Sequence, residues 1–293
     1  MRVSRLIVAV AAGGVFASIA GLTAAWAGVP EAQIARLGQD LTPMGAEKAG
    51  NADGSIPAWT GGLTSAPDGI GFKGDGYYPD PFASDPVLYT VNKGNAAQHG
   101  DLLTPGQKAM MAAYPDYKLN VYQSRRTCAL PQAVYDATKE NAKTAALGGG
   151  GDSLSGILMG IPYPLPFDAY EIAWNHNLRY RGYKMARTFA SAAPTRTGSF
   201  TPVIVKDEAI FDYASPDNRS FKALENVSVR YIQETLAPAR RAGQLLLVHE
   251  TVDPKLGERR SWQYTTGNAT SAPRVQRTSA VNYDNPQIYS DAM

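Results

Sequence analysis

The sequence predicts an α+β protein in which an antiparallel sheet follows a region of short helices. Before residue 160, short amphipathic segments are separated by Gly, Pro, Asn and Asp, whereas after residue 182 segments rich in Val, Ile, Tyr and Phe alternate with turn residues. No helical segment separates the later strands, so consecutive strands should pair as an antiparallel meander. We expect one α+β domain over residues 28–293, with helices and loops at 28–159 and strands at 160–293.

The first 27 residues have the order of a secretory signal peptide. Arg2 and Arg5 precede an apolar run, and Ala25-Trp26-Ala27 fits a small-x-small cleavage site. Gly and Ser interrupt the apolar run, which favours a cleaved signal over a membrane anchor. We therefore expect export to the periplasm, with cleavage after Ala27.

Charge and cysteine content exclude several classes of function. The chain has 28 Lys and Arg and 26 Asp and Glu, so loss of Arg2 and Arg5 with the signal leaves 26 of each and a net charge of zero. Basic residues nowhere cluster beyond pairs, so no nucleic-acid partner is expected. Cys128 is the single cysteine, which excludes an internal disulfide and a cysteine-based zinc site; we expect it to be a buried small side chain.

The region before residue 160 predicts several short helices. One should surround Ile34 and Leu37, and another should begin at Thr42-Pro43. Thr104 to Gln107 reads as a capping box that starts a helix over 105–113. A further helix from Pro131 to about residue 146 should place these residues near one stripe: Val134, Ala137, Thr138 and Asn141.

Loops separate these helices. Four aspartates between residues 50 and 86 lack the spacing of a calcium loop, so turn formation is favoured and no metal or cofactor is expected. The four are Asp53, Asp68, Asp75 and Asp80. Gly148 to Gly151 should form a flexible loop.

Five strands are expected after residue 177. They are 178–189 with a bulge at Gly182, 202–213, a strand from Val227, 244–252, and one around Trp262 and Tyr264. Residues 245–248 are apolar at every position, which predicts an interior strand covered on both faces. The helices of residues 29–147 are the candidates for covering the sheet, but they are weakly amphipathic, so a second sheet layer or an apolar ligand is needed to complete the core.

The stretch from Gly160 to Gly182 links the two regions and holds the candidate ligand-binding residues. Three prolines force 161–167 into an extended conformation, and Asp168 is placed to cap a short helix. The candidate residues are Ile161, Tyr163, Leu165, Phe167 and Trp174. This segment is either the rim of an apolar cavity or a fixed strap on the sheet edge, and both interpretations stay open. His176 is expected to cap an element, because no partner for catalysis lies near it in the sequence.

Several motifs together resemble domain-of-unknown-function family 1329, which is found in secreted proteobacterial proteins. They are Leu41-Thr-Pro-Met-Gly45, Gly50 to Gly54, Trp59-Thr-Gly-Gly62, Leu103 to Met110, Tyr114-Pro-Asp-Tyr117, and Trp174-Asn-His176 with Arg179-Tyr-Arg-Gly182. The resemblance implies a strongly curved antiparallel sheet, or half-barrel, with helices on its concave face and an apolar cavity, as in the bacterial carriers that sort lipoproteins to the outer membrane. Family members usually continue well past the equivalent of Tyr283 to Pro286, so the final strands of the family sheet are expected to be absent here. The family has no established catalytic residues, so the resemblance assigns none.

These observations lead to one expected function and two alternatives. The expected function is a periplasmic carrier or chaperone for an apolar ligand, such as a lipid or a lipidated protein. Because the resembling genes often lie beside exporters of the resistance-nodulation-division type, the chain could instead be an adaptor for such an exporter or for an outer-membrane protein. An uncharacterised enzyme is the third interpretation; His99, His176 and His249 are widely spaced in the sequence, so we do not expect one.

Overall fold

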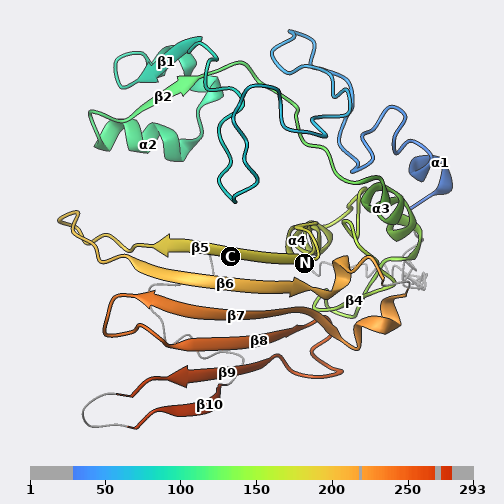
Figure 1. Cartoon of the computed structure of the whole chain (residues 1–293). Helices are drawn as coiled ribbons and strands as arrows, with labels where there is room; N and C mark the ends of the chain where they lie inside the picture. The colour runs from blue at the N-terminus through green and yellow to red at the C-terminus, as the bar shows by residue number, and fades with distance from the viewer. Residues whose placement is uncertain (1–28, 218–219, 268–271, 279–293) are drawn as a thin grey trace, which may run out of the picture.

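The computed structural model describes residues 29–217, 220–267 and 272–278, and it confirms the predicted α+β class (Figure 1). It contains a six-stranded antiparallel sheet, two small two-stranded sheets and several short helices. The predicted signal peptide at 1–27 and the chain beyond Thr278 lie outside the described residues. None of the helices in the described ranges has both the length and the apolar character that crossing a bilayer requires.

The main sheet is a meander in which spatial order follows sequence order. Its strands are β5 (Lys184–Ser191), β6 (Val203–Phe211), β7 (Val227–Ala237), β8 (Leu245–Thr251), β9 (Arg260–Thr265) and β10 (Arg274–Thr278). Every neighbouring pair is antiparallel, as predicted. Within the described residues the sheet is not closed, since β5 and β10 have one neighbour each. The sequence analysis missed β10 because its segment, RVQRT, has one strongly apolar residue and no clear alternation.

Two details of the predicted strands are wrong. The first strand begins at Lys184 and not at residue 178, because the preceding helix continues to Asn177. Gly182, at φ +86°, then turns the chain before the strand begins. The bulge predicted at Gly182 is therefore absent; the register shifts lie between Ile204 and Val205 and near the start of β7. The alternation predicted for β6 is confirmed, since its odd-numbered residues are buried throughout.

The interior position of β8 is confirmed, but its burial on both faces is wrong. β8 pairs with β7 on one side and β9 on the other. Val248 is fully buried, whereas the side chain of Leu247, which points to the opposite face, leaves the residue 36 % exposed. A continuous apolar run therefore indicated pairing on both sides without indicating packing on both faces.

The helices before the sheet are short. They are α1 (Glu31–Ile34), the 3₁₀ helix η1 (Ala96–Leu102), α2 (Pro105–Ala113), α3 (Gln132–Thr144) and α4 (Ala169–Asn177); η2 (Asp212–Ala214) and η3 (Phe221–Leu224) follow β6. The small sheets pair β1 (Tyr89–Asn92) with β2 (Lys118–Val121), and β3 (Ala146–Leu147) with β4 (Leu154–Ser155). The predicted glycine loop at 148–151 is part of the turn between β3 and β4.

Side-chain caps fix two helix starts where the sequence predicted them. Thr104 and Gln107 form the complete capping box of α2. Asp168 accepts a hydrogen bond from the Glu171 backbone N–H at 2.9 Å and so caps α4. The buried stripe of α3 is also confirmed at Val134, Thr138 and Asn141.

Other expectations before residue 160 need correction. No helix begins at Thr42; its hydroxyl accepts the Ala46 N–H at 3.1 Å within a turn, because Gly45 follows in a left-handed conformation. Cys128 is exposed and not buried. Three of the loop aspartates, Asp53, Asp75 and Asp80, accept a hydrogen bond from the N–H two residues on, which confirms the turn interpretation for them.

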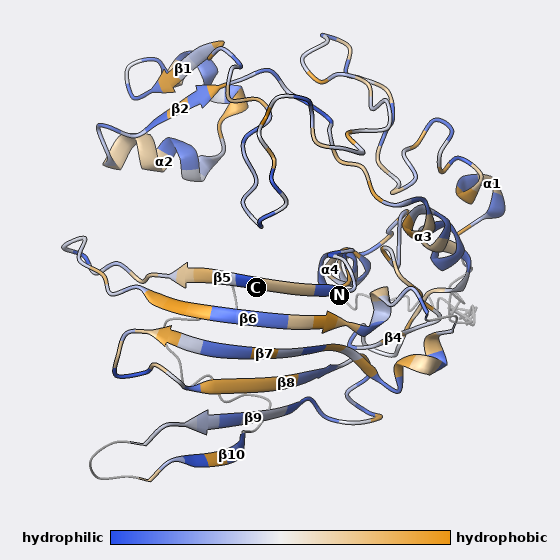
Figure 2. Ribbon diagram, in the orientation of Figure 1, coloured by the Kyte–Doolittle hydropathy of each residue, from blue (hydrophilic) through white to orange (hydrophobic). Residues whose placement is uncertain are grey.

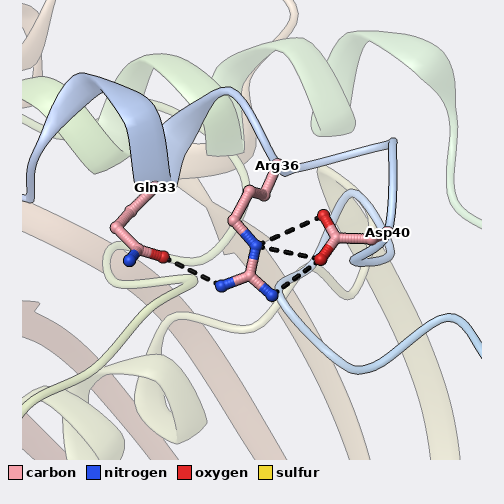
Figure 3. A network of polar contacts seen from close by, with 3 residues as sticks. All are labelled: Gln33, Arg36 and Asp40. Atoms are coloured by element: carbon pink, nitrogen blue, oxygen red, sulfur yellow. Dashed lines mark hydrogen bonds and ion pairs between the residues drawn. The ribbon is translucent and has the colours of Figure 1, made fainter.

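The turn after α1 is organised by an exposed polar network (Figure 3). The Arg36 guanidinium donates to the Asp40 carboxylate at 2.7 and 2.9 Å and to the Gln33 side-chain oxygen at 3.0 Å. This hydrogen bonding holds the pKa of the Asp40 carboxyl below its ordinary value. Beneath the network Ile34, Leu37 and Leu41 pack with Ala142 of α3, which fixes α1 to that helix.

The apolar core is divided into three clusters. The largest lies at one end of the main sheet, where Ala209 and Phe211 of β6 pack with Leu154 and Ile157 and with Trp174 of α4. The cover for the sheet thus comes from residues 145–159 and α4, because the helices of residues 29–147 bury their apolar residues in two clusters of their own. One of these joins β1, β2 and α2 into a unit that we call the small lobe (residues 87–122), which stands apart from the sheet in Figure 1.

Candidate ligand-binding site

Residues 161–167 are extended, as predicted, and two asparagine side chains hold the backbone of this segment and of the residues just before it. Asn141 of α3 is 1 % exposed and accepts the Leu158 N–H at 2.8 Å. Its amide nitrogen faces three carbonyl oxygens, those of Leu158 at 3.2 Å, Met159 at 3.4 Å and Ile161 at 3.1 Å. Prolines leave the segment without a regular strand ladder, and the buried amide of Asn141 satisfies the backbone groups instead.

Asn175 of α4 makes the second attachment. Its side-chain oxygen accepts the Tyr163 N–H at 2.8 Å and its amide donates to the Tyr163 carbonyl at 2.6 Å. Tyr163 is buried, and its hydroxyl has no hydrogen-bond partner among the described residues. Burial, followed by the nearby Glu171 carboxyl, raises the pKa of the Tyr163 hydroxyl. The segment is therefore attached to α3 and α4 along its length, which is the geometry of a strap.

The five predicted site residues point into different surroundings. Leu165 packs against the α1 and α3 cluster, while Trp174 packs in the sheet core and donates its indole N–H to the Gly151 carbonyl at 3.0 Å. Ile161 is half-buried, Tyr163 is buried, and Phe167 is 69 % exposed. The structure does not bring the five around one cavity, and their contact with a ligand stays a prediction.

A pocket of about 430 Å³ lies in the small lobe instead. That volume is within the range of small-molecule sites, roughly 300–1,000 Å³. Aliphatic and aromatic residues predominate in its lining, which consists of Tyr89, Val91, His99, Leu102, Leu103, Gln107, Leu119, Asn120, Val121 and Tyr122.

The pocket has a buried floor and an exposed apolar mouth. Val91 and Leu103 are almost fully buried, whereas Leu102 is 73 % exposed, Tyr122 is 48 % exposed and Tyr89 is 40 % exposed. The rings of Tyr89 and His99 stack with centroids 5.0 Å apart and planes inclined by 10°. An apolar ligand covering the mouth would remove large side chains from water and gain a flat aromatic surface.

Local hydrogen bonds position the residues of this pocket. The Asn95 amide donates to the Thr90 carbonyl at 2.9 Å and its oxygen accepts the Asn92 N–H at 2.8 Å, which fixes the turn from β1 into η1 and so places His99 beside Tyr89. The side-chain oxygens of two lining amides already accept hydrogen bonds from the protein. The Gln107 side chain accepts the Thr104 N–H in the capping box, and the Asn120 side chain accepts the Thr90 hydroxyl.

The sequence analysis missed this site, although a signal for it is present. Residues 87–89 are Val, Leu and Tyr, and Leu102-Leu103 comes directly before the capping box of α2. Apolar residues just before a predicted helix are also typical of a hydrophobic staple, so this signal alone does not indicate a pocket. Recognising a pocket needed the pairing of β1 with β2, which joins segments about thirty residues apart.

Several titratable groups with shifted pKa values lie on the main sheet or in η2, which directly follows β6. Burial raises the pKa of the Asp212 carboxyl, although Arg230 pairs with it at 2.9 Å. Burial lowers the pKa of the His249 imidazole, with Arg260 and Arg230 acting in the same direction and Asp212 opposing them. His99 lies in the small lobe and His176 at the end of α4, so the fold keeps the three histidines on separate elements. In the described part of the chain, no three His, Cys, Asp or Glu residues are grouped for a metal ion.

Comparisons with known proteins give a family model and a curated relative, both of unknown function. The family model described as "Protein of unknown function (DUF1329)" matches residues 90–293. The chain is 40 % identical over 281 residues to "Uncharacterized protein PA3922" of Pseudomonas aeruginosa; the match covers 96 % of this chain and 60 % of that protein. The chain thus spans about 60 % of the length of this relative. No solved structure matches the chain.

Proposed function

The chain belongs to the DUF1329 family of proteins of unknown function, and from that membership and its geometry we propose that it is a periplasmic carrier or chaperone for an apolar ligand. The ligand class is an acyl chain or a flat apolar ring system, as found in a lipid or a lipidated protein. Periplasmic location is part of the proposal, and it rests on the order of basic, apolar and small residues in 1–27.

The apolar mouth of the small-lobe pocket is the observation that carries this proposal. Leu102 alone is 73 % exposed beside a pocket of about 430 Å³. Covering one such side chain contributes about 1 to 2 kcal/mol, so a ligand that covers Leu102, Tyr122 and Tyr89 together gains several kcal/mol before the cost of its immobilisation.

The pocket's few polar groups also agree with an apolar ligand. The side-chain oxygens of Gln107 and Asn120 already accept hydrogen bonds from the protein. A ligand with hydrogen-bond donors would find these two acceptors already occupied. The stacked pair of Tyr89 and His99 favours a ligand with a planar or extended apolar part.

A fluorescent apolar probe, N-phenyl-1-naphthylamine, tests this proposal. The wild-type protein should bind the probe, and the Leu102→Ser/Tyr122→Ser double variant should bind it at least about tenfold more weakly, the equivalent of losing about 1.4 kcal/mol. Both side chains are largely exposed, so the thermal midpoint should change little. Tyr77→Ser, which removes an aromatic ring 82 % exposed outside the pocket, is the control. Equal probe binding by all three proteins would refute the proposed site.

A further inference from the structure

Within the described residues, one face of the main sheet keeps large apolar side chains exposed on β7, β8 and β10. In an antiparallel sheet, residues that pair directly point to the same face. The pairs Ile232 with Leu247 and Leu247 with Trp262 therefore place these three side chains in one row across the sheet. The next row pairs Leu245 with Tyr264 and Tyr264 with Val275. We call these two rows the apolar rows of the open face.

Three of the six side chains in these apolar rows are exposed, and Leu245, Trp262 and Tyr264 are half-buried. Val275 is 68 % exposed, Ile232 is 39 % exposed and Leu247 is 36 % exposed. The main core lies on the opposite face, where Ala209 pairs with Tyr231. Figure 2 shows most of β8 in the hydrophobic colour in the middle of the sheet. A contiguous exposed apolar surface of this kind marks an interaction site more often than a simple surface.

Positive charge flanks the apolar rows. Arg277 pairs directly with Trp262, and Arg260 lies two residues before Trp262 on the same face of β9. The side chains that β8, β9 and β10 contribute to this face include no carboxylate; they are Leu245, Leu247, His249, Arg260, Trp262, Tyr264, Val275 and Arg277. The carboxylates of this face lie on β6 and β7, where Glu208 pairs with Ile232 and Glu234 pairs with Leu245. Neither Arg260 nor Arg277 has a hydrogen bond or ion pair to another described residue, whereas Arg230 on β7 is paired with Asp212 at 2.9 Å.

We propose that the open face docks on the surface of an anionic phospholipid bilayer. Trp262, Tyr264 and Leu247 enter the interfacial layer, where amphipathic rings are stable, and the two arginines contact lipid phosphates. Apolar burial and charge attraction act together, and two weak signals of this kind give stable membrane binding where one does not. This proposal rests on the sheet alone and does not depend on the pocket in the small lobe.

The charge distribution disfavours two other partners for this face, a second copy of the chain and a neutral bilayer. In a two-fold dimer whose axis passes near Trp262, the arginines beside Trp262 would approach the arginines of the second copy. That arrangement repels, whereas an anionic lipid surface attracts every arginine at once. A neutral bilayer would satisfy the apolar rows and leave the arginines without partners.

Vesicle flotation tests the proposal with the mature chain. We expect binding to vesicles of phosphatidylcholine with about one quarter phosphatidylglycerol, and at least about tenfold weaker binding to pure phosphatidylcholine, since each basic residue near an anionic surface contributes separately. Arg260→Glu/Arg277→Glu should lose this binding by at least about tenfold. The matched control is Arg196→Glu/Arg274→Glu, which makes the same change of charge in the β5–β6 loop and on the opposite face of β10. High salt should weaken wild-type binding.

Each other outcome overturns the proposal. Absence of flotation with the anionic vesicles overturns it directly, and equal losses in the two double variants would show that net charge acts without a specific face. A wild-type dimer in light scattering that Arg260→Glu/Arg277→Glu dissociates would identify a second copy as the occupant. Folding of the variants is checked by circular dichroism, and binding of the naphthylamine probe should be unchanged in both, so failure here is distinguishable from failure of the proposed pocket.

Discussion

Asn141 offers the sharpest test of how the strap is held, because a single buried side chain serves four backbone groups. Its amide has two hydrogens for three carbonyl oxygens at 3.1 to 3.4 Å, and its oxygen accepts the Leu158 N–H at 2.8 Å. At most three of these bonds are well formed at one time. With about 1 kcal/mol for each, and a further cost for a buried N–H left unpaired, Asn141→Ala should destabilise the protein by about 2 to 4 kcal/mol.

The assay is denaturant unfolding followed by circular dichroism, with Lys139→Ala as the control. Lys139 is an exposed residue of the same helix, so its replacement should change the free energy of unfolding by less than about 0.5 kcal/mol. Asn141→Asp keeps the oxygen that faces Leu158 but places a carboxylate among carbonyl oxygens, which raises the pKa of the new carboxyl in the folded state. That variant should recover stability relative to Asn141→Ala as the pH falls toward about 4. An unfolding midpoint for Asn141→Ala equal to that of Lys139→Ala would refute the reasoning.

Three other predictions follow from burial, backbone conformation and pKa. Leu165→Ser should lower the free energy of unfolding by about 1 to 3 kcal/mol, because Leu165 packs against the α1 and α3 cluster. Phe167→Ser should change the free energy of unfolding little, because Phe167 is 69 % exposed, and the reverse order in denaturant titrations would contradict the strap. Gly160→Ala should destabilise the folded protein by more than about 1 kcal/mol, since Gly160 has φ +97° and a Cβ there would lie 2.9 Å from a carbonyl oxygen of α3. Gly149→Ala is the control, because its Cβ meets open space, and equal thermal midpoints for the two variants would disprove the prediction. Because burial lowers the pKa of His249, the folded state resists its protonation, and the stability of the wild-type protein should fall as the pH drops below about 6.5. His249→Gln should lose less stability between about pH 7.5 and 5.5, and identical losses in thermal melts would show that His249 does not contribute.

The parts of the fold that the sequence predicted are those with a local cause. The capping box of α2 satisfies its own N–H groups within four residues, so Thr104 and Gln107 specify the helix start wherever the helix lies. The alternation along β6 likewise reports one buried face, and the structure shows it residue by residue. α1 shows the limit, because the helix predicted around Ile34 and Leu37 ends at Ile34, and Leu37 is buried from an isolated bridge that packs against α3.

The candidate site was less predictable because its geometry depends on contacts between distant residues. Proline spacing predicted the extended course of 161–167, but the amides of Asn141 and Asn175 decide which way its side chains point. Similarly, Leu245 to Val248 indicated an interior strand, while the exposed face at Leu247 depends on which elements cover the sheet. No local pattern states that residues 145–159, and not α1 to α3, supply that cover.

The measurement that tests the carrier proposal most directly is mass spectrometry of whatever remains bound to the protein after gentle purification from its native periplasm. The proposal predicts a near-stoichiometric apolar molecule in organic extracts of the wild-type protein, and its loss from Leu102→Ser/Tyr122→Ser purified in parallel. Tyr77→Ser should retain it. Extracts without any such molecule, or equal amounts from the double variant and the wild type, would contradict the proposal that the small-lobe pocket carries an apolar ligand.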